Sequence, residues 1–152
     1  MGGILKPGQG APDFDAKDQS GNRVSLRSMR GRPVVLYFYP KDDTPGCTAE
    51  ACSFRDSMDI LRERGVVVLG VSVDSEESHE KFASKYNLNF TLLSDTNKEI
   101  VRAYGVESPF KTAKRVTYLI GPDGVIKYVF THVNTSTHAA DVLKKLEELK
   151  LV

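Results

Sequence analysis

The 152-residue sequence has no tryptophan, only two cysteines and almost no net charge. With 21 Lys and Arg against 20 Asp and Glu, the formal charge of +1 excludes a globally basic surface, and we expect no nucleic-acid partner. The longest apolar run, Val66 to Val71, is far shorter than the roughly 18 residues of a membrane span, so no membrane partner is expected. Two cysteines are also too few for a small secreted disulfide scaffold. Together with the absence of a secretory signal pattern at the N-terminus, this predicts a cytoplasmic protein.

The length favours one domain over residues 1–152, since domains commonly have about 150 residues. The runs Val34–Tyr39 and Val66–Val73 are rich in β-branched or aromatic residues without polar alternation, which is typical of central strands buried on both faces. Between them, apolar residues recur at helical spacing from Cys47 to Leu61. A strand, a helix and a second strand in this order predict a right-handed crossover with parallel pairing.

The second half of the chain also carries helix and strand signals. A helix is expected over 75–86, and a third helix is expected to begin at Thr96, with Glu99 completing a capping box. A β-hairpin is predicted around the Pro122-Asp123-Gly124 turn, followed by a C-terminal amphipathic helix. The fold class is therefore α/β, with a central mixed β-sheet flanked by helices in a thioredoxin-like order.

The most informative segment joins the first central strand to the first long helix. Ligand sites of open α/β sheets lie at this end of the strands. Thr44 is a suitable N-cap residue and Pro45 suits the first helical position, which places Cys47 in the first turn. There, unpaired backbone N–H groups and the positive end of the helix dipole favour a thiolate over a thiol.

Cys52 follows five residues later on the same predicted helix. An ideal helix separates such Cα atoms by about 8.5 Å. A disulfide requires about 7 Å or less, so the two cysteines cannot bond while the helix is intact. This spacing argues against a structural disulfide and favours a transient one that forms when the helix unwinds locally.

Three other interpretations compete at this point. A zinc site would combine the two cysteines with His132 and His138, but the separation between the pairs is far longer than in a zinc finger. A disulfide reductase of the thioredoxin type would require Cys-x-x-Cys, whereas four residues separate the cysteines here. A non-enzymatic thiol sensor or binding module would use the same Cys47 but react stoichiometrically, without catalytic turnover. Asp42 and Asp43 are expected in a solvated turn, and His79 on an exposed helix face.

The segment Pro40-Lys-Asp-Asp-Thr44-Pro-Gly-Cys47 resembles the active-site motif of the peroxiredoxins, with Cys52 in the position of the resolving cysteine of the bacterioferritin-comigratory-protein (peroxiredoxin Q) type. Other similar segments extend over nearly the whole chain: Ala11–Phe14, Tyr37–Pro40, Phe90–Asp95, Arg115–Ile120 and Thr135–His138. The resemblance implies a thioredoxin-like fold and a thiol-dependent peroxidase that requires no metal, haem, flavin or other cofactor.

The resemblance also implies a role for each matching residue. Cys47 would attack a hydroperoxide as thiolate, and Cys52 would resolve the resulting sulfenic acid as an intramolecular disulfide. The implied partners are a hydroperoxide substrate and thioredoxin or a similar dithiol reductant. An intramolecular disulfide removes the need for a dimer, so a monomer is expected, with a weak dimer left open.

Four further residues match positions around the reactive cysteine. Thr44 would donate a hydrogen bond to the peroxide and the thiolate. Arg115 would stabilise the thiolate and the developing charge on oxygen, and Glu50 would orient Arg115. Pro40 would shield the site from water.

Overall fold

The computed structural model describes residues 3–152, so residues 1 and 2 of the predicted 1–152 domain lie outside the described part. The elements in chain order are β1 (Asp15–Asp18), β2 (Arg23–Ser25), a 3₁₀ turn (Arg27–Met29), β3 (Val34–Phe38), α1 (Pro45–Glu63), β4 (Val67–Ser72), α2 (Glu76–Tyr86), β5 (Thr91–Ser94), α3 (Glu99–Ala103), β6 (Val116–Ile120), β7 (Ile126–Phe130) and α4 (His138–Glu148).

All seven strands in residues 3–152 belong to one mixed sheet with the order β2-β1-β5-β4-β3-β6-β7. β3 pairs in parallel with β4, and β4 in parallel with β5, which confirms the predicted crossover. β6 runs antiparallel to β3 and forms the predicted hairpin with β7. Every described strand therefore joins one continuous sheet, and the single domain over residues 1–152 stays a prediction.

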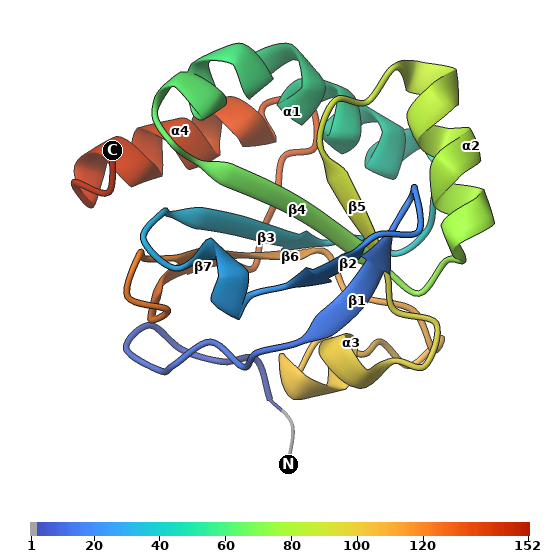
Figure 1. Cartoon of the computed structure of the whole chain (residues 1–152), viewed down its shortest axis with the longest axis horizontal. Helices are drawn as coiled ribbons and strands as arrows, with labels where there is room; N and C mark the ends of the chain where they lie inside the picture. Colours follow the sequence, from blue (N-terminus) through green and yellow to red (C-terminus); the bar gives the residue numbers. More distant parts are fainter. Residues whose placement is uncertain (1–2) are drawn as a thin grey trace.

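Helices cover both faces of the sheet, as Figure 1 shows, with α1, α2 and α4 on one side and α3 on the other. Every residue of β3 is buried, because its side chains point alternately into the two cores. Val35 and Tyr37 pack in the core under α1 and α4, whereas Leu36 and Phe38 pack in the core on the α3 side. This double burial explains why the β3 sequence has no polar alternation.

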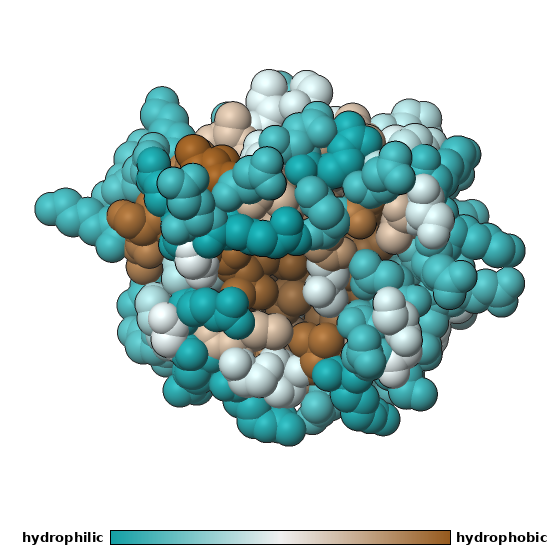
Figure 2. All heavy atoms as spheres, turned by 45° about the horizontal axis from the view of Figure 1, so that its top comes forward, coloured by the Kyte–Doolittle hydropathy of each residue, from teal (hydrophilic) through white to brown (hydrophobic). Residues whose placement is uncertain are grey.

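Figure 2 shows hydrophobic side chains gathered in a hollow at the centre of one face, with hydrophilic residues around them. No helix in residues 3–152 is long and apolar enough to cross a bilayer.

One detail of the helices differs from the sequence prediction. The third helix begins at Glu99 and not at Thr96, because Lys98 is left-handed (φ 63°) and the Asp95 carboxylate accepts the N–H groups of Ile100 and Val101. The Thr96–Glu99 capping box was therefore wrong. In α4, Val142 and Leu146 are fully buried, while Leu149 lies after the helix and is partly exposed.

Candidate active site

The first turn of α1 places Cys47 at the carboxyl end of β3. Thr44 is the N-cap residue and Pro45 the first helical residue, as the sequence predicted. Cys47 is 1% exposed, and no acidic side chain lies in the first turn of the helix. The sulfur therefore lies in a nearly dry environment beside the positive end of a helix dipole.

Arg115, which immediately precedes β6, connects this sulfur to a buried carboxylate. Its Nη2 donates to Sγ of Cys47 at 3.4 Å, and its Nη1 donates to Oε1 of Glu50 at 2.7 Å. Glu50 is completely buried one helical turn after Cys47 on the same face of α1. Two donors in the rigid plane of one guanidinium thus bind the cysteine and the carboxylate together.

Burial is the main influence on the pKa of Glu50. Desolvation raises the pKa of Glu50 to about 7, although Arg115 acts to lower it. Burial acts to lower the pKa of Arg115, but the neighbouring Cys47 and Glu50 outweigh it and the pKa is raised. Arg115 therefore remains a cation beside the sulfur at all pH values of interest.

His138, at the first position of α4, lies beside Glu50 and so adjoins the group formed by Cys47, Glu50 and Arg115. Its Nε2 lies 2.8 Å from Oγ1 of Thr117 and 3.8 Å from Oε2 of Glu50. Desolvation lowers the pKa of His138 to about 4, so the ring is neutral near pH 7. Sequence patterns could not show that His138 lies beside Glu50, because this proximity depends on how α4 packs against α1.

Thr44 and Pro40 precede Cys47 in the segment that leads from β3 into α1. Pro40 directly follows the buried Tyr39 and is itself partly buried. The Thr44 hydroxyl donates to the carbonyl oxygen of Lys41 at 2.9 Å and makes no side-chain cap hydrogen bond. It therefore leaves the first-turn N–H groups of α1 free of a side-chain cap.

Cys52 is partly buried on the same helix, and both cysteines are free thiols. Because α1 is continuous from Pro45 to Glu63, the separation expected of an ideal helix applies. The structure thus represents a state in which a Cys47–Cys52 disulfide has not formed and cannot form without local unwinding.

Two expectations about neighbouring residues were wrong. His79 is fully buried, and Asp42 is 8% exposed rather than part of a solvated turn. Sequence patterns missed this because their partners come from separate elements: His79 contacts Asp42 and the carbonyl oxygen of Leu93. Asp43, as expected, is exposed.

The zinc interpretation receives no support from the arrangement of the cysteines. Within residues 3–152, the one group of at least three side chains with suitably close ligand atoms consists of Asp42, Asp74 and His79, and it contains neither cysteine. Nε2 of His138 is instead next to Thr117.

The arrangement around Cys47 suits nucleophilic chemistry. A thiolate at this position would be stabilised by the helix N-terminus and by Arg115, and the same donors would stabilise negative charge on an attacked oxygen. A thioredoxin-like fold with such a cysteine defines a thiol-dependent redox protein.

Comparisons with known proteins agree with this class. Residues 7–129 match the model of the AhpC/TSA family. Peroxiredoxin Bcp of Escherichia coli strain K12 is 46% identical over 151 residues, covering 95% of this chain and 97% of the relative. A mutant of PrxQ from Xylella fastidiosa has a similar structure, with a TM-score of 0.92, 30% identity and coverage of 98% and 99% of the two chains. A bacterioferritin comigratory protein from Xanthomonas campestris, described for its alkyl peroxide reduction activity, has a TM-score of 0.84 and 32% identity, with coverage of 89% and 90%.

The chain therefore belongs to the AhpC/TSA family and, with its Bcp and peroxiredoxin Q relatives, to the peroxiredoxins, which are thiol peroxidases. Peroxides are the substrates of this family and a thiol is its reductant.

Proposed function

We propose that Cys47 is the peroxidatic cysteine and Cys52 the resolving cysteine of a monomeric peroxidase recycled by thioredoxin or a similar dithiol. The observation that carries the proposal is the contact between Arg115 Nη2 and Cys47 Sγ at the N-terminus of α1. It places a permanent cation and a helix dipole beside one buried sulfur, which is the environment that activates a cysteine. Cys52 has no such contact among the described hydrogen bonds and remains the slower, resolving thiol.

The proposed chemistry has three balanced steps. The Cys47 thiolate attacks the terminal oxygen of a hydroperoxide, the O–O bond breaks, and the sulfur becomes a sulfenic acid while the leaving oxygen takes a proton as water or alcohol. The Cys52 thiol then displaces hydroxide from the sulfenic sulfur, giving a disulfide and water. An external dithiol reduces this disulfide by exchange through a mixed disulfide.

The other matching residues receive their roles from the family resemblance. Glu50 holds Arg115 through the 2.7 Å ion pair and so orients the Nη2 donor toward the sulfur. Pro40 limits the access of water next to Cys47. Thr44 would bind the peroxide once its hydroxyl turns away from the Lys41 carbonyl.

Hydrogen peroxide and alkyl hydroperoxides are proposed as substrates. The relative from Xanthomonas campestris, described for alkyl peroxide reduction, supports the second class. Both free cysteines fit a compartment that supplies dithiol reductants, such as the cytoplasm.

The test compares peroxide consumption by the wild-type protein, Cys47→Ser and Cys52→Ser, with thioredoxin, thioredoxin reductase and NADPH. Cys47→Ser is expected to abolish turnover. Cys52→Ser is expected to complete one round of oxidation and then stop. Turnover by Cys47→Ser would overturn the assignment of the peroxidatic cysteine. Undiminished recycling of Cys52→Ser would show that another thiol resolves the sulfenic acid.

A further inference from the structure

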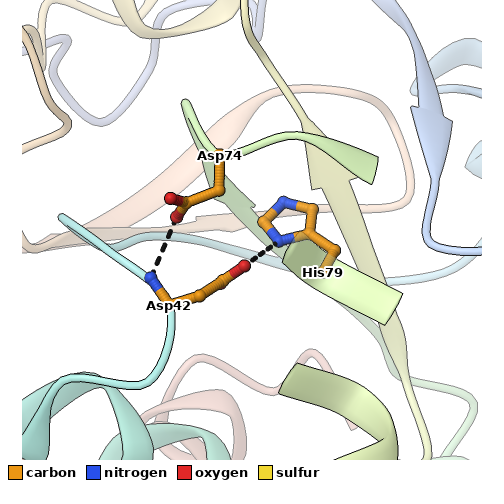
Figure 3. Close-up of side chains that lie close together, drawn as sticks. All are labelled: Asp42, Asp74 and His79. Carbon is orange, nitrogen blue, oxygen red and sulfur yellow. Dashed lines mark hydrogen bonds and ion pairs between the residues drawn. The ribbon is translucent and has the colours of Figure 1, made fainter. Parts of the chain in front are cut away.

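A buried carboxylate lies in the loop that leads into the active site. This loop, Pro40–Thr44, connects β3 to α1, and its Asp42 is only five residues before Cys47. Figure 3 shows the Asp42 side chain directed at the His79 ring of α2, while its backbone nitrogen faces Asp74. Nδ1 of His79 lies 2.7 Å from Oδ2 of Asp42, and the His79 ring is fully buried.

The partners of the His79 ring determine where its protons lie. Nε2 is 2.9 Å from the carbonyl oxygen of Leu93, which can only accept, so Nε2 carries a hydrogen. Nδ1 and the Asp42 carboxylate face each other at hydrogen-bond distance, so one further proton lies between them. Without this proton, two buried acceptors would oppose each other, and the contact would be repulsive.

The Asp42 carboxylate also accepts hydrogen bonds from two hydroxyl groups. The Tyr39 hydroxyl donates to Oδ1 at 2.6 Å, and the Ser78 hydroxyl donates to Oδ2 at 2.8 Å. The backbone N–H of Asp42 donates to Asp74, which also accepts from the Ser72 hydroxyl. These bonds connect the loop to the ends of β3 and β4, to α2 and, through His79, to β5.

The backbone of the loop is also strained at the residue next to Asp42. Asp43 has φ 59°, a left-handed conformation that a non-glycine residue adopts only where the surroundings hold it. Two residues later Pro45 begins α1, so the conformation of this loop determines where the first turn of the helix and Cys47 lie.

We propose that Asp42 and His79 form a positioning pair, which holds the Pro40–Thr44 loop so that the first turn of α1 presents Cys47 to Arg115 and to the peroxide. The inference rests on the proposed function of Cys47. Neither side chain contacts the sulfur among the described hydrogen bonds, so the pair acts through the loop and takes no part in the reaction.

The proposal is tested by Asp42→Asn, His79→Gln and the double variant, each measured for the rate constant of Cys47 oxidation by hydrogen peroxide in a single turnover. We expect a decrease of about tenfold or more for each single variant, and no larger decrease for the double variant, because both changes disrupt one unit. The later conversion of sulfenic acid to disulfide is not expected to slow, since it requires the loop and helix to loosen. A general loss of stability would not slow the oxidation of Cys47 while leaving disulfide formation unchanged.

Asp43→Asn is the matched control in the same loop. It removes the charge of an exposed ion pair with Lys85 while keeping a residue type that tolerates the left-handed conformation. Its oxidation rate constant is expected to remain within about twofold of the wild-type value.

Three results would overturn the proposal. One is an oxidation rate constant within about twofold of the wild-type value in the folded Asp42 and His79 variants. Another is an equal slowing of oxidation and disulfide formation. The third is a stoichiometric divalent metal that the purified wild-type protein retains and His79→Gln loses, which would assign the Asp42–Asp74–His79 group to a metal.

Should these variants fail to fold, Ser78→Ala provides a milder test, because it removes a single donor from Asp42. It is expected to slow oxidation about threefold, and an unchanged rate would overturn the proposal. A wild-type protein that fails to consume peroxide would contradict the proposed function itself.

Discussion

Nη2 of Arg115 lies 3.4 Å from Sγ of Cys47, although the two residues belong to different elements and are far apart in the sequence. The contact exists because β6 pairs with β3, whose carboxyl end leads into the helix that carries Cys47. Sheet pairing therefore builds the reactive centre, and four predictions follow from the contacts around it.

Replacing Arg115 by lysine should slow the reaction of Cys47 with hydrogen peroxide by about 100-fold, because an ammonium cannot bind Glu50 and the sulfur in the fixed geometry of a guanidinium. Stopped-flow measurement of Cys47 oxidation provides the rate constant. Lys114→Gln removes the exposed neighbouring cation and serves as the control. Equal rate constants for Arg115→Lys and the control would show that Arg115 does not stabilise the reacting atoms.

Gly46→Ala should slow the same reaction by several-fold without lowering the stability of the helix. A Cβ atom at Gly46 would lie 3.1 Å from Nη2 of Arg115, so the guanidinium must shift by a few tenths of an ångström. Alanine otherwise favours a helix over glycine. Rapid-kinetic oxidation and thermal unfolding measure the two effects separately, and an unchanged oxidation rate would show that the Arg115 position tolerates this shift.

Thr44→Val should lower the oxidation rate, and Thr44→Ser should retain most of it. Valine keeps the branched shape but removes the hydroxyl, which costs about 100-fold if the hydroxyl binds the reacting peroxide. Without a peroxide the hydroxyl only contacts the Lys41 carbonyl. If the two variants react equally fast, the hydroxyl serves the loop alone.

Glu50 and His138 should give opposite pH dependences of the free energy of unfolding. The pKa of Glu50 rises on folding from 4.5 to about 7, so its contribution to stability is present below pH 4.5 and is lost as the pH rises toward 7. The pKa of His138 falls on folding from 6.5 to about 4, so its contribution is present above pH 6.5 and is lost as the pH falls toward 4. Each shift corresponds to about 3 kcal/mol, and burial is the main cause of both.

The two dependences largely cancel in the wild-type protein between pH 4.5 and 6.5. Denaturant unfolding of Glu50→Gln should therefore show stability that rises with pH in this range, and His138→Asn should show stability that falls. Identical slopes in the two variants and the wild type would contradict the assigned directions.

The sequence predicted those parts of the molecule that depend on local pattern and on one specific motif. The strands β3 and β4, the helix α1 and the position of Cys47 follow from double-sided burial, helical spacing and the Thr44-Pro45 start. The proximity of Arg115 to Cys47 followed from the family resemblance alone, since a single arginine before a strand carries no local signal.

The parts that sequence reasoning missed are buried polar contacts between distant elements. His79 sits in a polar stretch of α2, yet it is buried because Asp42 and the Leu93 carbonyl satisfy its ring. Likewise, the Asp95 carboxylate shifts the start of α3 by accepting backbone N–H groups there. Such partners become adjacent only when the sheet is assembled, so periodicity cannot reveal them.

The most direct test of the account is mass spectrometry of the reduced protein after one equivalent of hydrogen peroxide, with the remaining thiols alkylated. The account predicts a loss of two hydrogens, a cross-linked peptide pair containing Cys47 and Cys52, and no alkylated thiol. Because both residues lie within α1, this product would also show that the first turns of the helix unwind during the cycle. Recovery of both cysteines as ordinary alkylated thiols would contradict the account, because it would show that Cys47 is not activated.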